Sequence, residues 1–175
     1  MNMSLKGKII AILCEKNYQE LEVWYPTLRL REEGATVLLV GTGSAKEYPG
    51  KCGYPCKVDT SAEKVNADDI DGVIIPGGYA PDILRMYDSI NNLVADVFHQ
   101  GKVVAAICHG LWVPASAGIL KDKKSTCYVA IKDDVIHAGA DYVDEECVVD
   151  GNLITSRKPD DLPVFMKAVI AALEK

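Results

Sequence analysis

The chain contains 175 residues, with 49% hydrophobic and 25% charged side chains and a formal net charge of −6 at pH 7. This composition is ordinary for a soluble protein, and the length predicts a single domain spanning residues 1–175. The negative charge and the absence of a long basic cluster argue against nucleic acid or an anionic membrane surface as a partner.

Targeting and membrane segments are not expected. The longest uncharged apolar runs fall far short of the ~20 residues that a membrane-spanning helix needs. Residues Met1–Lys6 lead directly into an apolar strand, which does not fit a secretory signal. We therefore expect a cytoplasmic protein, whose six cysteines are mostly reduced thiols and not a disulfide framework.

Apolar runs and helical patterns alternate along the first part of the chain. Pro26 is expected to kink the first helix or to mark a late start. Residues 45–69 look irregular, with two short strands expected around Gly53–Tyr54 and Lys57–Val58. The turn Gly41–Ser44 is a weak candidate for phosphate binding, because no helix follows it. The elements expected here are the strands Lys8–Leu13, Thr36–Val40 and Gly72–Ile75 and the helices Tyr18–Glu33 and Asp88–Gln100.

The second part of the chain continues this alternation. A buried strand at Val103–Ile107 precedes a short helix that ends at Gly118, and Asp160 or Asp161 is expected to cap a last helix. Strands that alternate with helices predict an α/β fold with a mostly parallel sheet covered on both faces. Ligands of such sheets bind beyond the carboxyl ends of the strands. The other elements expected are a short helix or turn at Ile131–Ala138, strands within Tyr142–Val143 and Cys147–Ile154, and the helix Leu162–Leu173.

The apolar strand Val103–Ile107 stops abruptly at Cys108, and His109 and Gly110 follow it. A cysteine at a sharp strand-to-helix turn has the layout of a nucleophile elbow, which requires small neighbours such as Gly110. The thiol would lie at a helix N-terminus, where unpaired N–H groups and the helix dipole favour a thiolate with a pKa of ~4–7 instead of ~8.5. The alternative is a buried structural thiol, since free cysteine is often buried.

A nucleophilic cysteine also needs an oxyanion site and a group that moves protons. The backbone N–H groups of Gly78 and His109 are candidates for the oxyanion site, although Gly77-Gly78 also fits a simple tight turn. His109 is the candidate for proton transfer, or else a residue that only caps the helix. Because neighbours at a turn often point apart, we expect His109 to need a carboxylate partner such as Asp82.

Three glutamates follow the first strand. Glu15 and Glu20 are expected to face solvent. Glu22 lies among apolar residues, either on the polar face of its helix or buried beside the thiol, where a protonated carboxyl could donate a hydrogen bond to a thiolate. No metal or cofactor is expected, because Cys52 and Cys56 lack suitably spaced histidines and Cys14–Asn17 has no glycine for a flavin phosphate loop.

Blocks of sequence along nearly the whole chain resemble the ThiJ/PfpI superfamily, specifically its PfpI-type intracellular protease branch. They include E-V-W-Y-P around Glu22, K-C-G-Y around Lys51, P-G-G-Y-A-P-D, A-I-C-H-G, A-G-A-D-Y-V-D and V-V-D-G-N-L-I-T-S-R. The resemblance implies a flavodoxin-like three-layer sandwich, related to class I glutamine amidotransferase domains, with a mostly parallel central sheet.

The resemblance also implies a site. It implies a catalytic cysteine at Cys108 next to His109, with Glu22 beside the thiol. The substrate pocket is expected to include Lys51, Tyr54, Gly78 and Tyr128. Asp82 stands where the PfpI type has an acidic residue that reaches into the neighbouring subunit's site and orients the histidine. A homo-oligomer, such as a dimer or hexamer, is therefore expected.

Several positions depart from the family pattern. The family usually has Glu where Asp82 stands, so the carboxylate here is one methylene shorter. Leu111 replaces a common proline and is followed by Trp112. A common Glu is missing at Gln19 and a common His at Cys52, changes that alter the pocket without removing the nucleophile.

Two classes of function compete. In the first, Cys108 attacks a carbonyl, and the resemblance implies either reactive dicarbonyls and their early protein adducts (glyoxalase or deglycase activity) or peptide bonds. The reaction with an aldehyde needs fewer catalytic groups, because a hemithioacetal forms without expelling an amine. In the second, the chain is a redox-sensing or chaperone-like stress protein in which Cys108 is oxidised to a sulfinate. The substitution His109→Ala separates the two, because it should abolish turnover but not oxidation.

Overall fold

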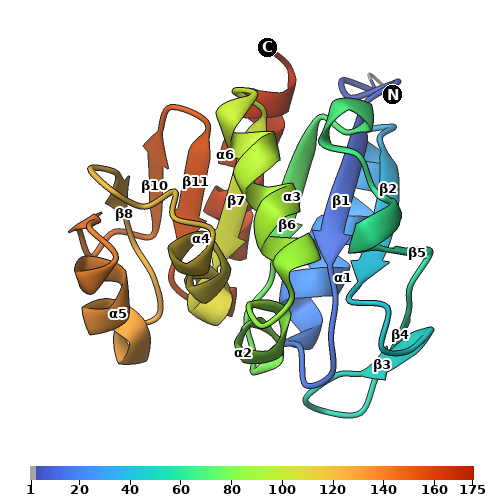
Figure 1. Cartoon of the computed structure of the whole chain (residues 1–175). Coiled ribbons are helices and arrows are strands. Elements are labelled where there is room, and N and C mark those ends of the chain that lie inside the picture. The colour runs from blue at the N-terminus through green and yellow to red at the C-terminus, as the bar shows by residue number, and fades with distance from the viewer. Residues whose placement is uncertain (1–2) are drawn as a thin grey trace.

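A sheet of seven strands forms the middle of the protein in this computed structural model, which describes residues 3–175 (Figure 1). The strand order is β10-β11-β7-β6-β1-β2-β5, and all neighbouring pairs are parallel except β10 and β11. The strands are β1 (Ile9–Leu13), β2 (Thr36–Gly41), β5 (Thr60–Ser61), β6 (Gly72–Ile75), β7 (Val103–Ile107), β10 (Cys147–Asp150) and β11 (Leu153–Ser156).

The three central strands, β1, β6 and β7, carry no charged or polar side chain. β6 reads GVII and β7 reads VVAAI, and every residue in both is buried. Continuous apolar runs are typical of parallel strands that are covered on both faces. The order β2-β1-β6-β7-β11 of the parallel strands is the 2-1-3-4-5 order of flavodoxin-like folds, which confirms the predicted fold class.

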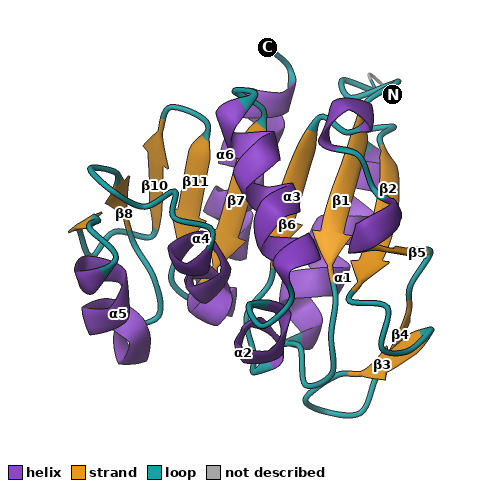
Figure 2. Cartoon of the chain, in the orientation of Figure 1, coloured by secondary structure: helices purple, strands orange, loops and turns teal. Residues whose placement is uncertain are grey.

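Helices cover both faces of this sheet (Figure 2). Helix α3 (Asp88–His99) packs on one face, against β6 and β7. Helices α1 (Glu20–Glu32) and α6 (Leu162–Leu173) pack against each other on the opposite face. The result is the expected three-layer sandwich. No helix within residues 3–175 is both long and apolar enough to cross a bilayer.

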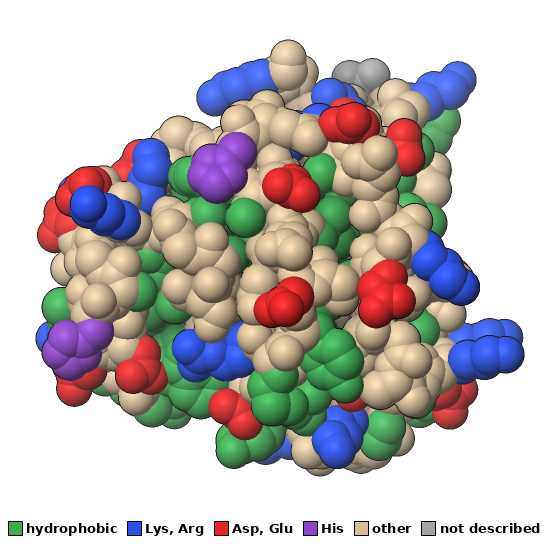
Figure 3. Space-filling model, viewed as in Figure 1, with side chains coloured by type: hydrophobic (Ala, Val, Ile, Leu, Met, Phe, Trp, Pro, Cys, Tyr) green, Lys and Arg blue, Asp and Glu red, His purple; other side chains and the backbone are tan. Residues whose placement is uncertain are grey.

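Three short helices lie outside the main layers: α2 (Ala80–Leu84), α4 (Trp112–Ser116) and α5 (Lys132–His137). A small parallel pair, β8 (Lys124–Ser125) and β9 (Asp141–Tyr142), lies beside α5. Apolar side chains gather at the lower edge of the molecule over α2 (Figure 3). Tyr79 and Met86, at the two ends of this helix, are 58% and 70% exposed.

Helix α1 contains Pro26 in its interior, so the predicted late start at this residue is wrong, and the kink stays a prediction. Its N-cap is Gln19, whose side-chain oxygen accepts a hydrogen bond from the backbone N–H of Glu22 at 3.0 Å. Pro26 cannot donate to the carbonyl one turn earlier, but its ring is buried in the core. We attribute the tolerance of Pro26 to this packing.

A hairpin of β3 (Glu47–Pro49) and β4 (Pro55–Lys57) projects beside the carboxyl end of β1. The predicted strand at Gly53–Tyr54 is wrong, because these residues lie in the loop of the hairpin. Tyr18 holds the loop: its hydroxyl donates to the carbonyl of Tyr54 at 2.6 Å, and its carbonyl accepts from the N–H of Lys51 at 2.9 Å.

Asp161 occupies the N-cap position of α6, as one of the two residues predicted there. Its carboxylate does not cap the helix, however. It pairs with Arg157, with Oδ2 at 2.9 Å from Nε, and is 4% exposed. The buried ion pair therefore replaces the side-chain cap expected from the sequence.

Candidate active site

Cys108 begins a tight turn directly after β7. Its φ is 62°, in the left-handed region that side chains other than glycine rarely adopt, and such backbone strain costs roughly 1–3 kcal/mol. A 3₁₀ turn over Cys108–Leu111 leads into α4. Gly110 is required by close packing, since a Cβ there would lie 2.4 Å from the carbonyl oxygen of Ile75. This strand–turn–helix geometry is the elbow that the sequence predicted.

Glu22 is fully buried and lies beside the Cys108 thiol. Its Oε2 accepts a hydrogen bond from the N–H of Gly77 at 2.7 Å. A Cβ on Gly77 would lie 2.6 Å from that oxygen and 3.0 Å from the sulfur of Cys108, so the turn after β6 closes over both groups. Of the two alternatives for Glu22, the buried position beside the thiol is the one observed.

Burial shifts the pKa of this carboxyl strongly. It raises the pKa of Glu22 from 4.5 to about 8, while the N–H of Gly77, the Cys108 thiol and the charge of Lys51 oppose the rise. Oε1 of Glu22 is buried and has no hydrogen-bond partner within residues 3–175. A protonated Glu22 therefore has a donor available for a neighbouring acceptor.

Burial also raises the pKa of the Cys108 thiol, to about 12, and the charge of Glu22 adds to the rise. The backbone N–H groups of His109 and Gly78 favour the thiolate and oppose this rise in the pKa. The predicted lowering of this pKa is therefore wrong for the resting site. The helix that follows the 3₁₀ turn has only five residues, and its dipole is too weak to offset burial.

His109 faces the thiol instead of pointing away from it. Its Nδ1 lies 3.3 Å from the sulfur of Cys108. The imidazole stacks on Tyr128, with ring centroids 5.0 Å apart. It also forms a T-shaped pair with the indole of Trp112, with ring centroids 5.2 Å apart. Burial and the nearby charge of Lys51 lower the pKa of His109, which favours the neutral ring.

The other predicted residues surround this centre at different distances. Gly78 has a φ of 76° and is bridged to Tyr18, whose backbone leaves no space for a side chain there. Lys51 and Tyr54 are exposed on the hairpin loop. Asp82 is half-buried on α2 and makes no hydrogen bond to His109 within residues 3–175. The single chain therefore does not bring Asp82 to the histidine.

Sequence reasoning missed several contributors. Glu15, expected to face solvent, is 1% exposed and accepts hydrogen bonds from the hydroxyls of Thr42 and Ser44. Tyr18 fixes the hairpin loop, and Trp112 contacts His109. The partners of Glu15 and Tyr18 come from distant segments, so no local pattern pointed to them. Trp112 lies three residues after His109, at a spacing that allows contact across one helical turn.

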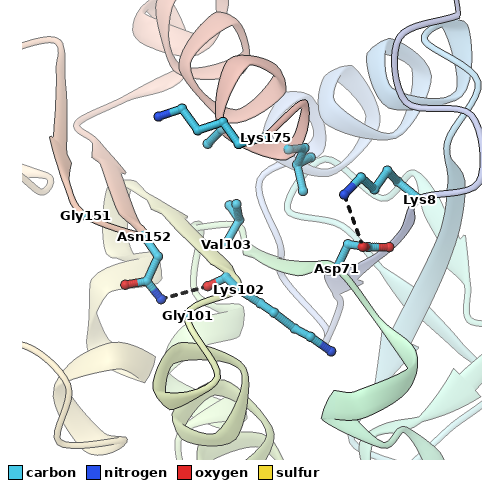
Figure 4. A pocket seen from close by; sticks show the side chains of 10 residues that line it. Lys8, Asp71, Gly101, Lys102, Val103, Gly151, Asn152 and Lys175 are labelled. Atoms are coloured by element: carbon cyan, nitrogen blue, oxygen red, sulfur yellow. Dashed lines mark hydrogen bonds and ion pairs between the residues drawn. The ribbon is translucent and has the colours of Figure 1, made fainter.

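A pocket of about 480 Å³ lies at the opposite, amino-terminal edge of the sheet (Figure 4). Several of its polar side chains are paired with one another or with the backbone: Lys8 with Asp71 at 3.5 Å, and Asn152 with the carbonyl of Lys102 at 2.8 Å. The nucleophilic and acidic groups described above are not among its lining residues. We therefore place the candidate active site at the carboxyl ends of β1, β6 and β7.

A flavodoxin-like fold with a cysteine elbow and a buried glutamate defines a class of α/β proteins, and comparison with known families identifies it. The model described as DJ-1/PfpI family matches residues 8–172. The chain therefore belongs to the DJ-1/PfpI family, in agreement with the resemblance that its sequence blocks indicated.

Known relatives are similar over their full length. Deglycase PYRAB04690 of Pyrococcus abyssi is 41% identical, covering 94% of this chain and 99% of the relative. YraA of Bacillus subtilis, named as a candidate cysteine protease, is 38% identical, covering 96% of this chain and 99% of that protein. These names agree with the predicted class of enzyme, a cysteine hydrolase or deglycase.

A solved structure from Anabaena variabilis also matches. It is a two-domain protein with DJ-1/ThiJ/PfpI-like and ferritin-like domains. The match has a TM-score of 0.93 at 40% identity and covers 95% of this chain but 48% of the other. This chain thus spans about half of that protein.

Proposed function

We propose that the protein is a cysteine-dependent hydrolase in which Cys108 acts on reactive dicarbonyls or on the early adducts that they form with proteins. The observation that carries the proposal is the arrangement around the sulfur. The buried carboxyl of Glu22 lies beside the sulfur, the Nδ1 atom of His109 lies 3.3 Å from it, and the backbone N–H groups of Gly78 and His109 favour its thiolate form. The name of the P. abyssi relative supports the same substrate class.

The chemistry follows from these groups. The sulfur of Cys108 attacks the aldehyde carbon of the dicarbonyl, and the carbonyl oxygen takes up the proton that the thiol has lost, giving a hemithioacetal. The N–H groups of Gly78 and His109, which flank the sulfur, are the proposed donors to the developing oxyanion. Glu22 or His109 then moves a proton from the former aldehyde carbon to the neighbouring carbon. The hydroxyl proton on the former aldehyde oxygen passes to the ketone oxygen, which gives a thioester of a 2-hydroxy acid. Water hydrolyses the thioester, restores the thiol and releases the acid.

Peptide bonds are a second candidate substrate class, favoured by the name of YraA. The same nucleophile would form an acyl-enzyme, but an amine would have to be protonated and expelled. Neutral His109 beside the sulfur is placed to carry that proton. A non-catalytic role through oxidation of Cys108 is the alternative from a different class.

The test is turnover by the purified protein in an amine-free buffer. Methylglyoxal loss and lactate formation are measured for the wild type, Cys108→Ser, His109→Ala and Glu22→Gln, beside a quenched fluorescent peptide. The proposal requires lactate formation by the wild type that disappears in Cys108→Ser and collapses in His109→Ala. Lactate formation equal in the wild type and Cys108→Ser would overturn it. A sulfinate on Cys108 in both the wild type and His109→Ala, with no turnover, would favour the redox role.

We also propose that the protein works as a homo-oligomer in the cytoplasm. Support for the oligomer comes from the apolar side chains over α2, where exposed Tyr79 and Met86 flank Asp82. A second copy that covers this face would bring Asp82 near another site. Support for the location comes from the cysteines, all six of which are unpaired thiols, since a reducing compartment preserves them.

A further inference from the structure

Trp112 is held in place from two directions. Its indole N–H donates to Oδ2 of Asp134, on α5, at 2.8 Å. The guanidinium of Arg85, which follows α2, lies 5.6 Å from the centre of the indole ring. Arg85 is itself fixed, because its Nε donates to the hydroxyl of Ser116 at 2.9 Å. Side chains from two other segments, Asp134 on α5 and Arg85 after α2, thus restrict one tryptophan.

The restricted indole contacts the imidazole of His109. The two ring centroids are 5.2 Å apart and the planes are inclined by 66°, an edge-to-face arrangement. Tyr128 stacks on the same imidazole with an inclination of 29°. Within residues 3–175, the only hydrogen-bonding contact of the imidazole is Nδ1 with the sulfur of Cys108. Aromatic packing, and not a carboxylate, therefore sets the plane of this ring.

We infer that Trp112 is a positioning residue, which keeps Nδ1 of His109 directed at Cys108, and that Asp134 and Arg85 act through Trp112. The inference rests on the proposed function, in which His109 transfers protons. It also gives a role to Trp112, which follows the position where the usual proline is replaced by Leu111. A partner's carboxylate could still bind the other nitrogen of the imidazole, because the indole leaves Nε2 without a hydrogen bond.

The size of the effect follows from the contact. An edge-to-face aromatic pair contributes enough to change a rate by roughly threefold to tenfold if the contact is needed to reach the transition state. Loss of Trp112 should therefore lower kcat with methylglyoxal by this factor, with KM within about twofold of the wild type. Trp112→Phe retains a ring against His109 and should recover most of kcat. Asp134→Ala frees the indole and should lower kcat by less than Trp112→Ala.

The experiment compares Trp112→Ala, Trp112→Phe and Asp134→Ala with the control Asp133→Ala. Asp133 is an exposed neighbour of Asp134 on the same helix and contacts neither ring. Thermal unfolding checks that each variant is folded. Ring-proton NMR signals of His109, assigned with His109→Gln, give a readout that does not depend on turnover. The ring currents of Trp112 and Tyr128 should displace these signals from the values of a free histidine, and Trp112→Ala should move them toward those values.

The outcomes separate this inference from the proposed function. If folded Trp112→Ala has wild-type kcat and unchanged His109 signals, the inference is overturned even when Cys108→Ser is inactive. If the wild type does not convert methylglyoxal at all, the proposed function fails. The His109 signals of Trp112→Ala then still decide whether the indole positions the imidazole. Loss of kcat in Asp133→Ala equal to that in Asp134→Ala would also count against the role of Asp134.

Discussion

Cys108 and Glu22 share a buried space that accommodates one negative charge far better than two. Below about pH 8 Glu22 carries its proton, so its charge no longer opposes a thiolate. The N–H groups of Gly78 and His109 lower the pKa of the thiol, but it stays above that of Glu22, so in the resting site the carboxyl ionises before the thiol. The two groups titrate as a pair, and an ionised Glu22 is a base for the proton that the thiol loses when the sulfur reacts.

The raised pKa of Glu22 predicts how stability changes with pH. Because the folded-state pKa, about 8, exceeds the unfolded value near 4.5, the protonated carboxyl stabilises the fold below the unfolded value. That contribution decreases by about 1.4 kcal/mol for each pH unit above 4.5, and it is lost once the pH has risen through about 8. Glu22→Gln cannot ionise, so we expect it to gain a few kcal/mol relative to the wild type over this range.

Urea unfolding of the two proteins at about pH 5 and about pH 9 measures this difference. A constant difference between wild type and Glu22→Gln at both pH values would contradict a raised pKa. Glu20→Gln is a suitable control, because Glu20 lies in the same helical turn but is not fully buried.

Gly77 leaves just enough space for the thiol and the carboxyl, and Gly77→Ala tests that fit. A Cβ would come within 2.6 Å of Glu22 and 2.7 Å of the Cβ of Cys108. We expect a loss of roughly 1–3 kcal/mol in unfolding free energy, as for other overpacked sites. Alkylation of Cys108 by iodoacetamide, followed by mass spectrometry, should also slow at least tenfold. Gly118→Ala, where a Cβ would meet nothing within 4 Å, should leave alkylation unchanged.

Individual site residues were predictable from the sequence where one local pattern decides them. The abrupt end of VVAAI at Cys108 and the small residue at Gly110 were enough to predict the elbow. The buried position of Glu15 was not predictable, because its hydroxyl partners lie after the neighbouring strand. The pKa of Cys108 was misjudged for a related reason, since the sequence does not show how deeply the sulfur is buried or how short the helix is.

At the scale of elements, the bounds of the buried strands and long helices agree closely with the predictions. The hairpin was less predictable, because contacts with the start of α1 and the residues just before it hold the loop. Tyr18 donates to Tyr54, and Glu20 accepts from the N–H of Cys52. Lys51 and Tyr54, the predicted pocket residues, are therefore placed by a segment about thirty positions away in the sequence.

Removal of the Tyr18 hydroxyl tests this attachment of the hairpin. In Tyr18→Phe, the carbonyl of Tyr54 loses its donor at 2.6 Å, and the indole N–H of Trp24 loses its acceptor at 3.1 Å. We expect a loss of about 1–2 kcal/mol in unfolding free energy. Hydrogen exchange in residues 50–54 should also become faster. Tyr25→Phe is the matched control, because the Tyr25 hydroxyl has no hydrogen-bond partner within residues 3–175. Unchanged exchange in Tyr18→Phe would show that the loop is held by its other contacts.

At the scale of the whole molecule, the single chain completes the nucleophile, the carboxyl and the imidazole but leaves Asp82 apart from them. Asp82 lies on α2 between exposed Tyr79 and Met86, so a second copy that covers this face would bury apolar surface there. In a symmetric contact each copy could then present its Asp82 to the other's site. This arrangement would explain why Nε2 of His109 has no partner within residues 3–175.

Complementation between two inactive variants tests this arrangement. Asp82→Asn keeps Cys108, and Cys108→Ser keeps Asp82, so each alone should be inactive or nearly so. If Asp82 acts on a neighbour, subunits mixed in equal amounts should recover about a quarter of wild-type turnover. That fraction is the chance that a site with Cys108 adjoins a subunit with Asp82. Light scattering and native mass spectrometry would confirm that mixed oligomers form. Mixed oligomers without any recovery, or full activity of Asp82→Asn alone, would show that Asp82 does not complete a neighbour's site.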